Sequence, residues 1–142
     1  MLTLPRCSVA LSCANVTYQG GTQIPNYLEV IDLFQPPQVP VGVERFFAVF
    51  EFKDGAPGVY TTRLRVDGPD GFVNETRTMD ISFTTEVPNA RVAIEVRQFV
   101  FPHFGRYKFT FVISDHDVGF FTVDVRQGST AGFFSPPRPQ AG

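Results

Sequence analysis

The fold is decided by residues 105–126, which read Gly-Arg-Tyr-Lys-Phe-Thr-Phe-Val-Ile-Ser-Asp-His-Asp-Val-Gly-Phe-Phe-Thr-Val-Asp-Val-Arg. In the first half of this stretch, large apolar residues alternate with polar or charged ones: Tyr107, Phe109, Phe111 and Ile113 against Arg106, Lys108 and Thr110. Successive side chains of a β-strand point to opposite faces, so the pattern predicts one face in a core and one in water. The polar residues 114–117 predict a turn, and the rest predicts a returning strand.

The start of this hairpin indicates a second feature. Gly105 precedes Tyr107 by two residues, and a glycine lets the backbone turn tightly because it has no Cβ. The tyrosine ring then packs inward and its hydroxyl can reach back to the connection before the strand. This arrangement resembles the tyrosine corner of Greek-key sandwiches. The alternative is an ordinary tyrosine in a half-buried strand, and in both cases Tyr107 serves folding.

Composition limits the possible classes of protein. The chain has 142 residues, among them sixteen Phe and no Trp, and a net charge of −2. Aromatic and β-branched residues favour strands, and no run of helix-forming residues competes with them. There is no basic stripe to neutralise phosphates, so we expect no nucleic-acid partner. No apolar run approaches the roughly 20 residues that span a bilayer, so we expect no membrane segment.

The two cysteines suggest a cellular compartment. Cys7 and Cys13 lie in one expected strand, where six residues of extended chain span about 20 Å, too far for a disulfide. Alternation from Cys7 predicts that both sulfur atoms face the core. Two unpaired thiols are typical of a reducing environment, so we expect a cytoplasmic protein.

Along the chain, turn signals separate eight expected strands. Gly20-Gly21, residues 54–58 and residues 68–71 are such turns, rich in Gly, Pro and Asp. The expected strands are 6–17, 27–34, 43–53, 59–67, one centred on Met79, Ile81 and Phe83, one from Val92 to Phe101 with a bulge near Gln98, and the two of the hairpin. Seven or eight short strands predict an all-β, two-sheet antiparallel sandwich with an immunoglobulin-like Greek key. It would form one domain over residues 1–127, with a flexible Gly/Pro-rich tail over 128–142.

Four stretches together resemble a family of small, uncharacterised bacterial β-sandwich proteins. They are Cys-Ala-Asn-Val-Thr-Tyr-Gln-Gly-Gly-Thr from residue 13, Leu-Glu-Val-Ile-Asp-Leu-Phe from 28, Leu-Arg-Val-Asp-Gly-Pro-Asp-Gly from 64 and Phe-Pro-His-Phe-Gly-Arg-Tyr-Lys-Phe from 101. The sequence departs from the family pattern at Ala14-Asn15, where an acid is usual, and at Ile31-Asp32-Leu33, where a glycine is common. The shared residues are turn and core residues, so the resemblance implies a bacterial protein with this fold and no particular activity.

No catalytic, cofactor-binding or metal-binding site is predicted, although three positions carry residue types that such sites use. Asp115-His116-Asp117 could bind a divalent metal with His103 as a remote ligand, but adjacent turn residues rarely converge on one ion, and a solvated turn is the simpler interpretation. His103 could act as a base, but no Ser or Cys lies near it in sequence. Cys13 could be a nucleophile, but a core-facing thiol stays protonated and unreactive.

The leading functional hypothesis is therefore a non-catalytic module for protein interaction or structure, including self-association through a sheet face or edge. It rests on an excess of phenylalanine: Phe47 and Val49 oppose the Phe46 face of their strand, and Phe120 opposes Phe121. If one set fills the core, the other leaves apolar surface, which marks a contact site on a soluble domain. The alternative is a module that binds a small ligand or carbohydrate, with Tyr18, Tyr27 or Phe72 lining a groove.

Overall fold

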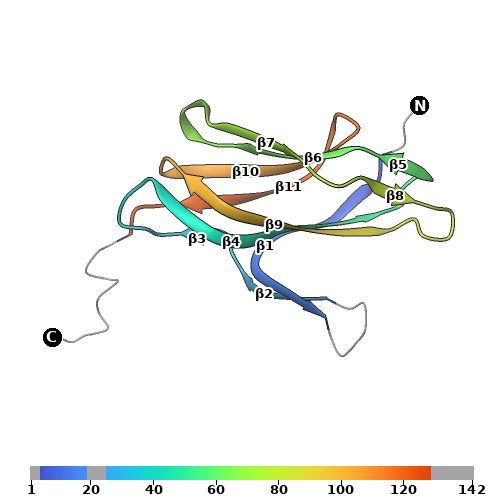
Figure 1. The fold of residues 1–142 in the computed structure, drawn as a ribbon, viewed down its shortest axis with the longest axis horizontal. Coiled ribbons are helices and arrows are strands. Elements are labelled where there is room, and N and C mark those ends of the chain that lie inside the picture. Colours follow the sequence, from blue (N-terminus) through green and yellow to red (C-terminus); the bar gives the residue numbers. More distant parts are fainter. Residues whose placement is uncertain (1–3, 19–24, 129–142) are drawn as a thin grey trace.

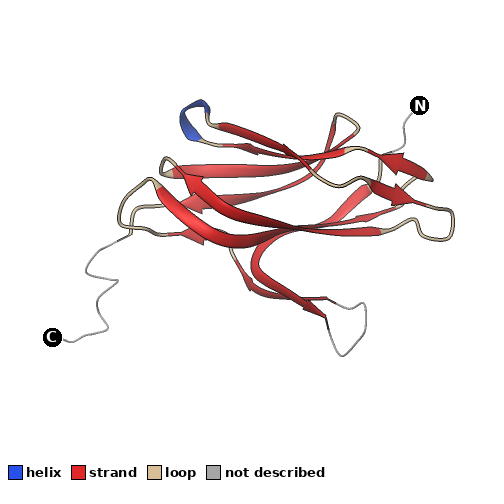
Figure 2. Cartoon of the chain, in the orientation of Figure 1, coloured by secondary structure: helices blue, strands red, loops and turns tan. Residues whose placement is uncertain are grey.

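A computed structural model describes residues 4–18 and 25–128 of the chain. Two larger sheets face each other, and a small third sheet lies at one end (Figures 1 and 2). Sheet A has the order β2-β1-β4-β9, made of β1 (Arg6–Tyr18), β2 (Pro25–Val30), β4 (Val41–Lys53) and β9 (Ala90–Phe101). Sheet B has the order β3-β11-β10-β6-β7, made of β3 (Leu33–Phe34), β11 (His116–Val125), β10 (Gly105–Ile113), β6 (Thr62–Asp67) and β7 (Val73–Arg77).

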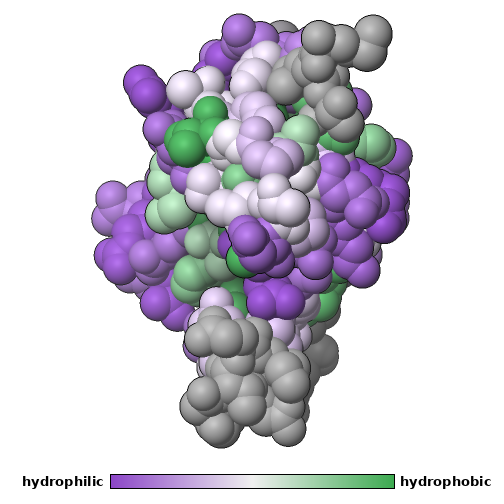
Figure 3. All heavy atoms as spheres, turned by 90° about the vertical axis from the view of Figure 1, so that its right-hand side faces the viewer, coloured by the Kyte–Doolittle hydropathy of each residue, from purple (hydrophilic) through white to green (hydrophobic). Residues whose placement is uncertain are grey.

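The third sheet pairs β5 (Gly58–Tyr60) with β8 (Ile81–Phe83). Figure 3 views the molecule from the end that carries β5 and β8, and it shows hydrophilic groups on both flanks with apolar groups between these flanks. The helical turn η1 (Pro69–Gly71) is three residues long, and no helix among the described residues is long and apolar enough to cross a membrane. The all-β sandwich predicted from alternation is confirmed.

The core lies between sheets A and B and consists largely of phenylalanine rings. The predicted inward face of β10 is confirmed, because Tyr107, Phe109, Phe111 and Ile113 are fully buried. The Phe109 ring stacks on the Phe121 ring with 4.9 Å between their centroids, and offset stacking is one of the geometries that aromatic pairs favour. The predicted inward face of β4 is likewise buried: Phe46, Ala48, Phe50 and Phe52.

The described residues form eleven strands instead of the eight expected, because two expected strands are divided and one was missed. Residues 27–34 divide at Ile31–Asp32: the Ile31 N–H donates to Ser12 of sheet A, and the Asp32 carbonyl accepts from Asp124 of sheet B. Residues 59–67 divide in the same way into β5 and β6. The missed strand, β7, lies at a sheet edge and is exposed throughout, so no alternation marks it.

Two details of the predicted strands were wrong. Met79 is exposed and lies outside β8, which contains only Ile81 and Phe83 of the expected trio. The turn of the hairpin is limited to Ser114 and Asp115, both with positive φ as in a two-residue type I′ turn. Residues 19–24 and 129–142, which include the Gly20-Gly21 turn and nearly all of the expected tail, lie outside the described residues.

The alternation of inward and outward side chains along β9 shifts near Gln98 without the predicted bulge. Pairing continues unbroken from Arg45–Arg97 to Val43–Phe99, so neither strand contains an extra residue. Instead Gln98 adopts a φ of 51°, in the left-handed region. Phe99 and Phe101 are buried, as predicted, although no bulge shifts the register of the two strands.

The two cysteines lie on opposite faces of sheet A, contrary to the prediction. A bulge between Cys7 and Val9 shifts the alternation of β1 by one residue. Cys7 pairs with Phe52 on the core face, whereas Cys13 pairs with Phe47 on the outer face, and cross-strand partners share a face. Cys13 is nevertheless fully buried and Cys7 half-buried, and both are free thiols.

Candidate functional site

The candidate site lies on the line along which sheet A meets sheet B beside β1 and β11. We call it the β1–β11 seam and define it as residues 7–12 and 117–122. Strand β2 pairs with β1 only from Cys13 onward, and β3 pairs with β11 only at Asp124 and Val125. Within the described residues, the seam therefore separates two strand edges that have no further partner.

Close approach of the two sheets at the seam depends on a missing side chain. A Cβ built on Gly119 of β11 would lie 2.5 Å from the Cys7 Sγ and 2.9 Å from its Cβ. Atoms at such distances overlap, so only glycine allows the half-buried Cys7 side chain to lie directly against the β11 backbone. The Cys7 thiol donates to the Val9 carbonyl at 3.2 Å, across the bulge of β1.

The hydrogen bonds at the end of the seam show which backbone groups face it. The Ser12 carbonyl accepts from Ile31, and the Asp124 N–H donates to Asp32, so the first group points away from β4 and the second away from β10. Backbone groups alternate in direction along a strand. The N–H and C=O groups of Ala10 in β1, and of Phe120 and Thr122 in β11, therefore face the seam as well.

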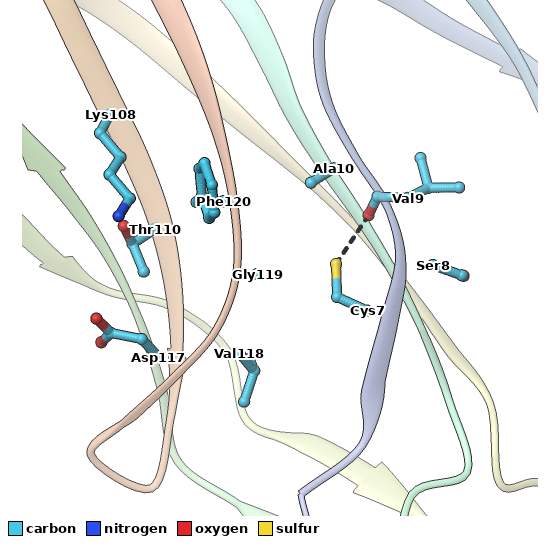
Figure 4. A pocket seen from close by; sticks show the side chains of 10 residues that line it. All are labelled: Cys7, Ser8, Val9, Ala10, Lys108, Thr110, Asp117, Val118, Gly119 and Phe120. Carbon is cyan, nitrogen blue, oxygen red and sulfur yellow. Dashed lines mark hydrogen bonds between the residues drawn. The ribbon is translucent and has the colours of Figure 1, made fainter.

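A groove of about 540 Å³ lies along the seam, between β1, β11 and the outer face of β10 (Figure 4). Phe120 is 55% exposed, and the Lys108 amino group lies 4.3 Å from the centroid of its ring, a cation–π contact. Thr110, the cross-strand partner of Phe120, is only 1% exposed, and its hydroxyl has no hydrogen-bond partner among the described residues. The groove thus combines an exposed ring, a cation and a buried unsatisfied hydroxyl.

The burial of Thr110 differs from the solvent-facing position that alternation predicted. Arginine side chains of β6 cross the outer face of β10 to reach carboxylates at the start of β11. Arg65 forms a two-pronged ion pair with Asp117 at 2.9 and 3.1 Å, and Arg63 pairs with Asp115 at 2.7 Å. The hydrogen bonds from Arg65 hold the pKa of Asp117 below its usual value. Thr110 lies between Arg65 and Phe120, its cross-strand partners on β6 and β11.

The same ion pairs account for the sequence cluster Asp115-His116-Asp117. Both carboxylates are directed to arginines, and His116 is exposed between them. No group of three or more potential metal-ligating side chains occurs in the part of the chain that the structure describes.

His103 belongs to the tyrosine corner, which the structure confirms. The Tyr107 hydroxyl donates to the His103 carbonyl at 2.8 Å and accepts from the His103 N–H at 3.0 Å. Burial raises the pKa of Tyr107 above its ordinary value. The His103 Nδ1 lies 3.6 Å from an Asp70 carboxylate, and neither residue lines the groove at the seam.

The thiols do not form a catalytic pair with either histidine. Burial raises the pKa of both Cys7 and Cys13, which disfavours the reactive thiolate. Cys7 lines the groove at the seam without a histidine, and Cys13 is buried on the other face of sheet A.

The three aromatic residues expected to line a carbohydrate groove are not gathered. Tyr18 is exposed near the end of the β1–β2 hairpin, which projects from the sandwich (Figure 1). Tyr27 is half-buried and donates its hydroxyl to Glu51, whose carboxylate also binds Arg91 at 2.9 Å. Phe72 packs edge-on against Phe99 and Tyr107.

The expected excess of apolar surface exists at only one of the two places. Val49 is fully buried and Phe47 half-buried, with the Arg45 guanidinium 5.4 Å from the Phe47 ring centroid. Phe120 is exposed as expected, whereas Phe121 is buried. Sequence reasoning therefore identified Phe120 but missed Lys108, Thr110 and the open strand edges, because no local pattern shows that β1 lies beside β11.

Comparison with known proteins identifies the family of the chain and structures with a similar fold. No curated protein sequence matches the chain. Among solved structures, the Pseudomonas fluorescens alkylpurine DNA glycosylase AlkC, bound to DNA containing an abasic site analog, matches with a TM-score of 0.57 at 9% identity; the match covers 86% of this chain and 30% of that one. The chain thus spans less than a third of that glycosylase, and the likeness concerns the fold alone.

Two further structures match with lower scores. An immunoglobulin-like protein from Pseudomonas aeruginosa has a TM-score of 0.40 at 15% identity, with 87% of this chain and 98% of that chain covered. A β-glucosidase from Listeria innocua, in complex with glucose, has a TM-score of 0.42 at 9% identity, with 78% and 19% covered. At the level of sequence, one family model matches residues 3–126, nearly the whole described region, and the chain therefore belongs to that family, the family of unknown function DUF6941.

Proposed function

We propose that the protein is a non-catalytic interaction module that binds another protein at the β1–β11 seam. The observation that carries the proposal is the groove of about 540 Å³, which places the exposed Phe120 ring and Lys108 beside two open strand edges. Aromatic rings are enriched at the centres of protein interfaces. Neither histidine lines the groove, and this placement and the raised pKa values of the thiols support a non-catalytic role.

A peptide-display selection tests this proposal directly. The full chain is immobilised and exposed to a library of random peptides, and the enriched peptides are synthesised for measurement of Kd by fluorescence anisotropy. We expect Phe120→Ser to weaken their binding about tenfold, which corresponds to about 1.4 kcal/mol. Val59→Ser is the matched control, because Val59 is exposed on β5, outside the groove. Absence of specific peptides, or equal binding by the two variants, would refute the proposal.

Self-association is the second form of this proposal, and the partner would then be another copy of the chain. Sedimentation equilibrium from micromolar to millimolar concentrations decides between the two. A mass that rises with concentration, and rises less for Phe120→Ser, supports self-association at the seam. A mass equal to one chain throughout rejects self-association and leaves the seam to a different protein.

A further inference from the structure

The β11 edge that faces the seam already accepts an added strand at one end. Strand β3 pairs with it in parallel at Asp124 and Val125, and the N–H groups of Asp124 and Arg126 donate to Asp32 and Phe34. Only two residues of β3 take part, so the row that β3 occupies ends there. The groove at the seam lies along the preceding residues of the same edge, 117–120.

The unpaired part of this edge presents hydrogen-bonding groups in the spacing that a strand requires. The N–H and C=O groups of Phe120 and Thr122 point in the same direction as the bonded N–H of Asp124, because backbone directions repeat every second residue. A peptide in extended conformation satisfies such an edge through its own alternate residues, which is the mode of recognition called β-strand addition.

The outer side of the groove holds a cation, Lys108, that can attract negative charge, because the Asp117 carboxylate of the same lining is already bound by Arg65. Lys108 forms no ion pair with the described residues, and its amino group is held over Phe120 at the mouth of the groove. Thr110 points to the same face of β10, two residues further on, and its hydroxyl is buried without a partner. A buried hydroxyl without a hydrogen bond destabilises a protein, so a ligand group that accepts from Thr110 would remove this cost.

We infer that the partner segment is an extended peptide that continues the row of β3 along β11 and carries a carboxylate side chain. Its backbone bonds to Phe120 and Thr122, and its carboxylate accepts hydrogen bonds from Lys108 and from Thr110. This inference rests on the proposed function and specifies both the conformation and the charge of the partner.

The binding mode is tested with an acidic peptide from the display selection. Amide hydrogen exchange is followed by NMR on the full chain, with and without that peptide. We expect slower exchange at Phe120 and Thr122, whereas Glu75 of the edge strand β7 serves as the control and stays unchanged. Two analogues of the peptide provide a second measurement: one is methylated at every odd-numbered backbone nitrogen and the other at every even-numbered one. An added strand requires that one analogue loses binding and the other retains it.

The preference for a carboxylate is tested by a double-mutant cycle. Lys108→Met should weaken the acidic peptide about tenfold but leave its Glu→Gln or Asp→Asn analogue unaffected. Thr110→Val should raise the Tm of the free protein, since it removes the unsatisfied hydroxyl, and should weaken the same peptide. If Thr110→Val stabilises the protein without any effect on binding, the hydroxyl has no role in recognition and this part of the inference fails.

The outcomes separate this inference from the proposed function. The seam binds proteins without strand addition if the binding of a peptide depends on Phe120 but leaves amide exchange at Phe120 and Thr122 unchanged. The same conclusion follows if both methylated analogues of that peptide still bind. A selection without specific peptides would refute the proposed function itself.

Discussion

Replacement of Tyr107 by Phe tests the tyrosine corner, on which the connection between β9 and β10 depends. The substitution keeps the buried ring and removes only the hydroxyl, which donates to the His103 carbonyl and accepts from the His103 N–H. Each hydrogen bond contributes about 1 kcal/mol, and the half-buried backbone groups of His103 lose their partner as well. We therefore expect the free energy of unfolding to fall by about 2–3 kcal/mol.

Urea denaturation followed by far-UV circular dichroism measures this change, since the chain has no tryptophan for fluorescence. For a domain of this size the Tm should fall by about 10 °C. Tyr60→Phe is a matched control with one hydrogen bond, to the Ala56 carbonyl at 2.9 Å, and should lose about 1 kcal/mol. If Tyr107→Phe differs from the wild type by less than about 0.5 kcal/mol, or no more than Tyr60→Phe does, the corner does not stabilise the fold as argued.

Three further predictions concern the seam and the charged groups. Gly119→Ala should destabilise the protein by about 1–3 kcal/mol in urea denaturation, because the added Cβ overlaps the Cys7 side chain. Cys7→Ala in the same chain should recover part of that loss, and full additivity of the two changes would contradict this contact. Burial and the Glu51 carboxylate raise the pKa of Tyr27 to about 12, so its contribution to stability is complete below pH 10 and is lost between pH 10 and 12. The stability of Tyr27→Phe should therefore decline less steeply in this alkaline range than that of the wild type, and an identical decline would refute the assignment. The lowered pKa of Asp117 contributes stability above about pH 4 that is lost in more acidic solution, so Asp117→Asn should be less sensitive to acid than the wild type in the same assay.

The candidate site shows where sequence reasoning ends. Alternation placed Phe120 outward and Phe121 inward, and the structure agrees. The same reasoning placed Thr110 in water, because it cannot show that arginines of β6 extend across β10 to Asp115 and Asp117. Those two aspartates therefore suggested a metal ligand set in sequence, whereas they serve as partners of Arg63 and Arg65 in space.

The sequence by itself determined the layers of this protein. A period of two over β4 and β10 fixes which side chains enter the core, and Gly105 with Tyr107 fixes the corner, because these patterns depend on neighbours within one strand. Only the tertiary structure decided where strands change sheets, how one bulge moved Cys7 and Cys13 to opposite faces, and that β1 lies beside β11 with both edges open. Contacts between residues more than a hundred positions apart, such as Cys7 with Gly119, are set by the packing of whole sheets, and no local pattern records them.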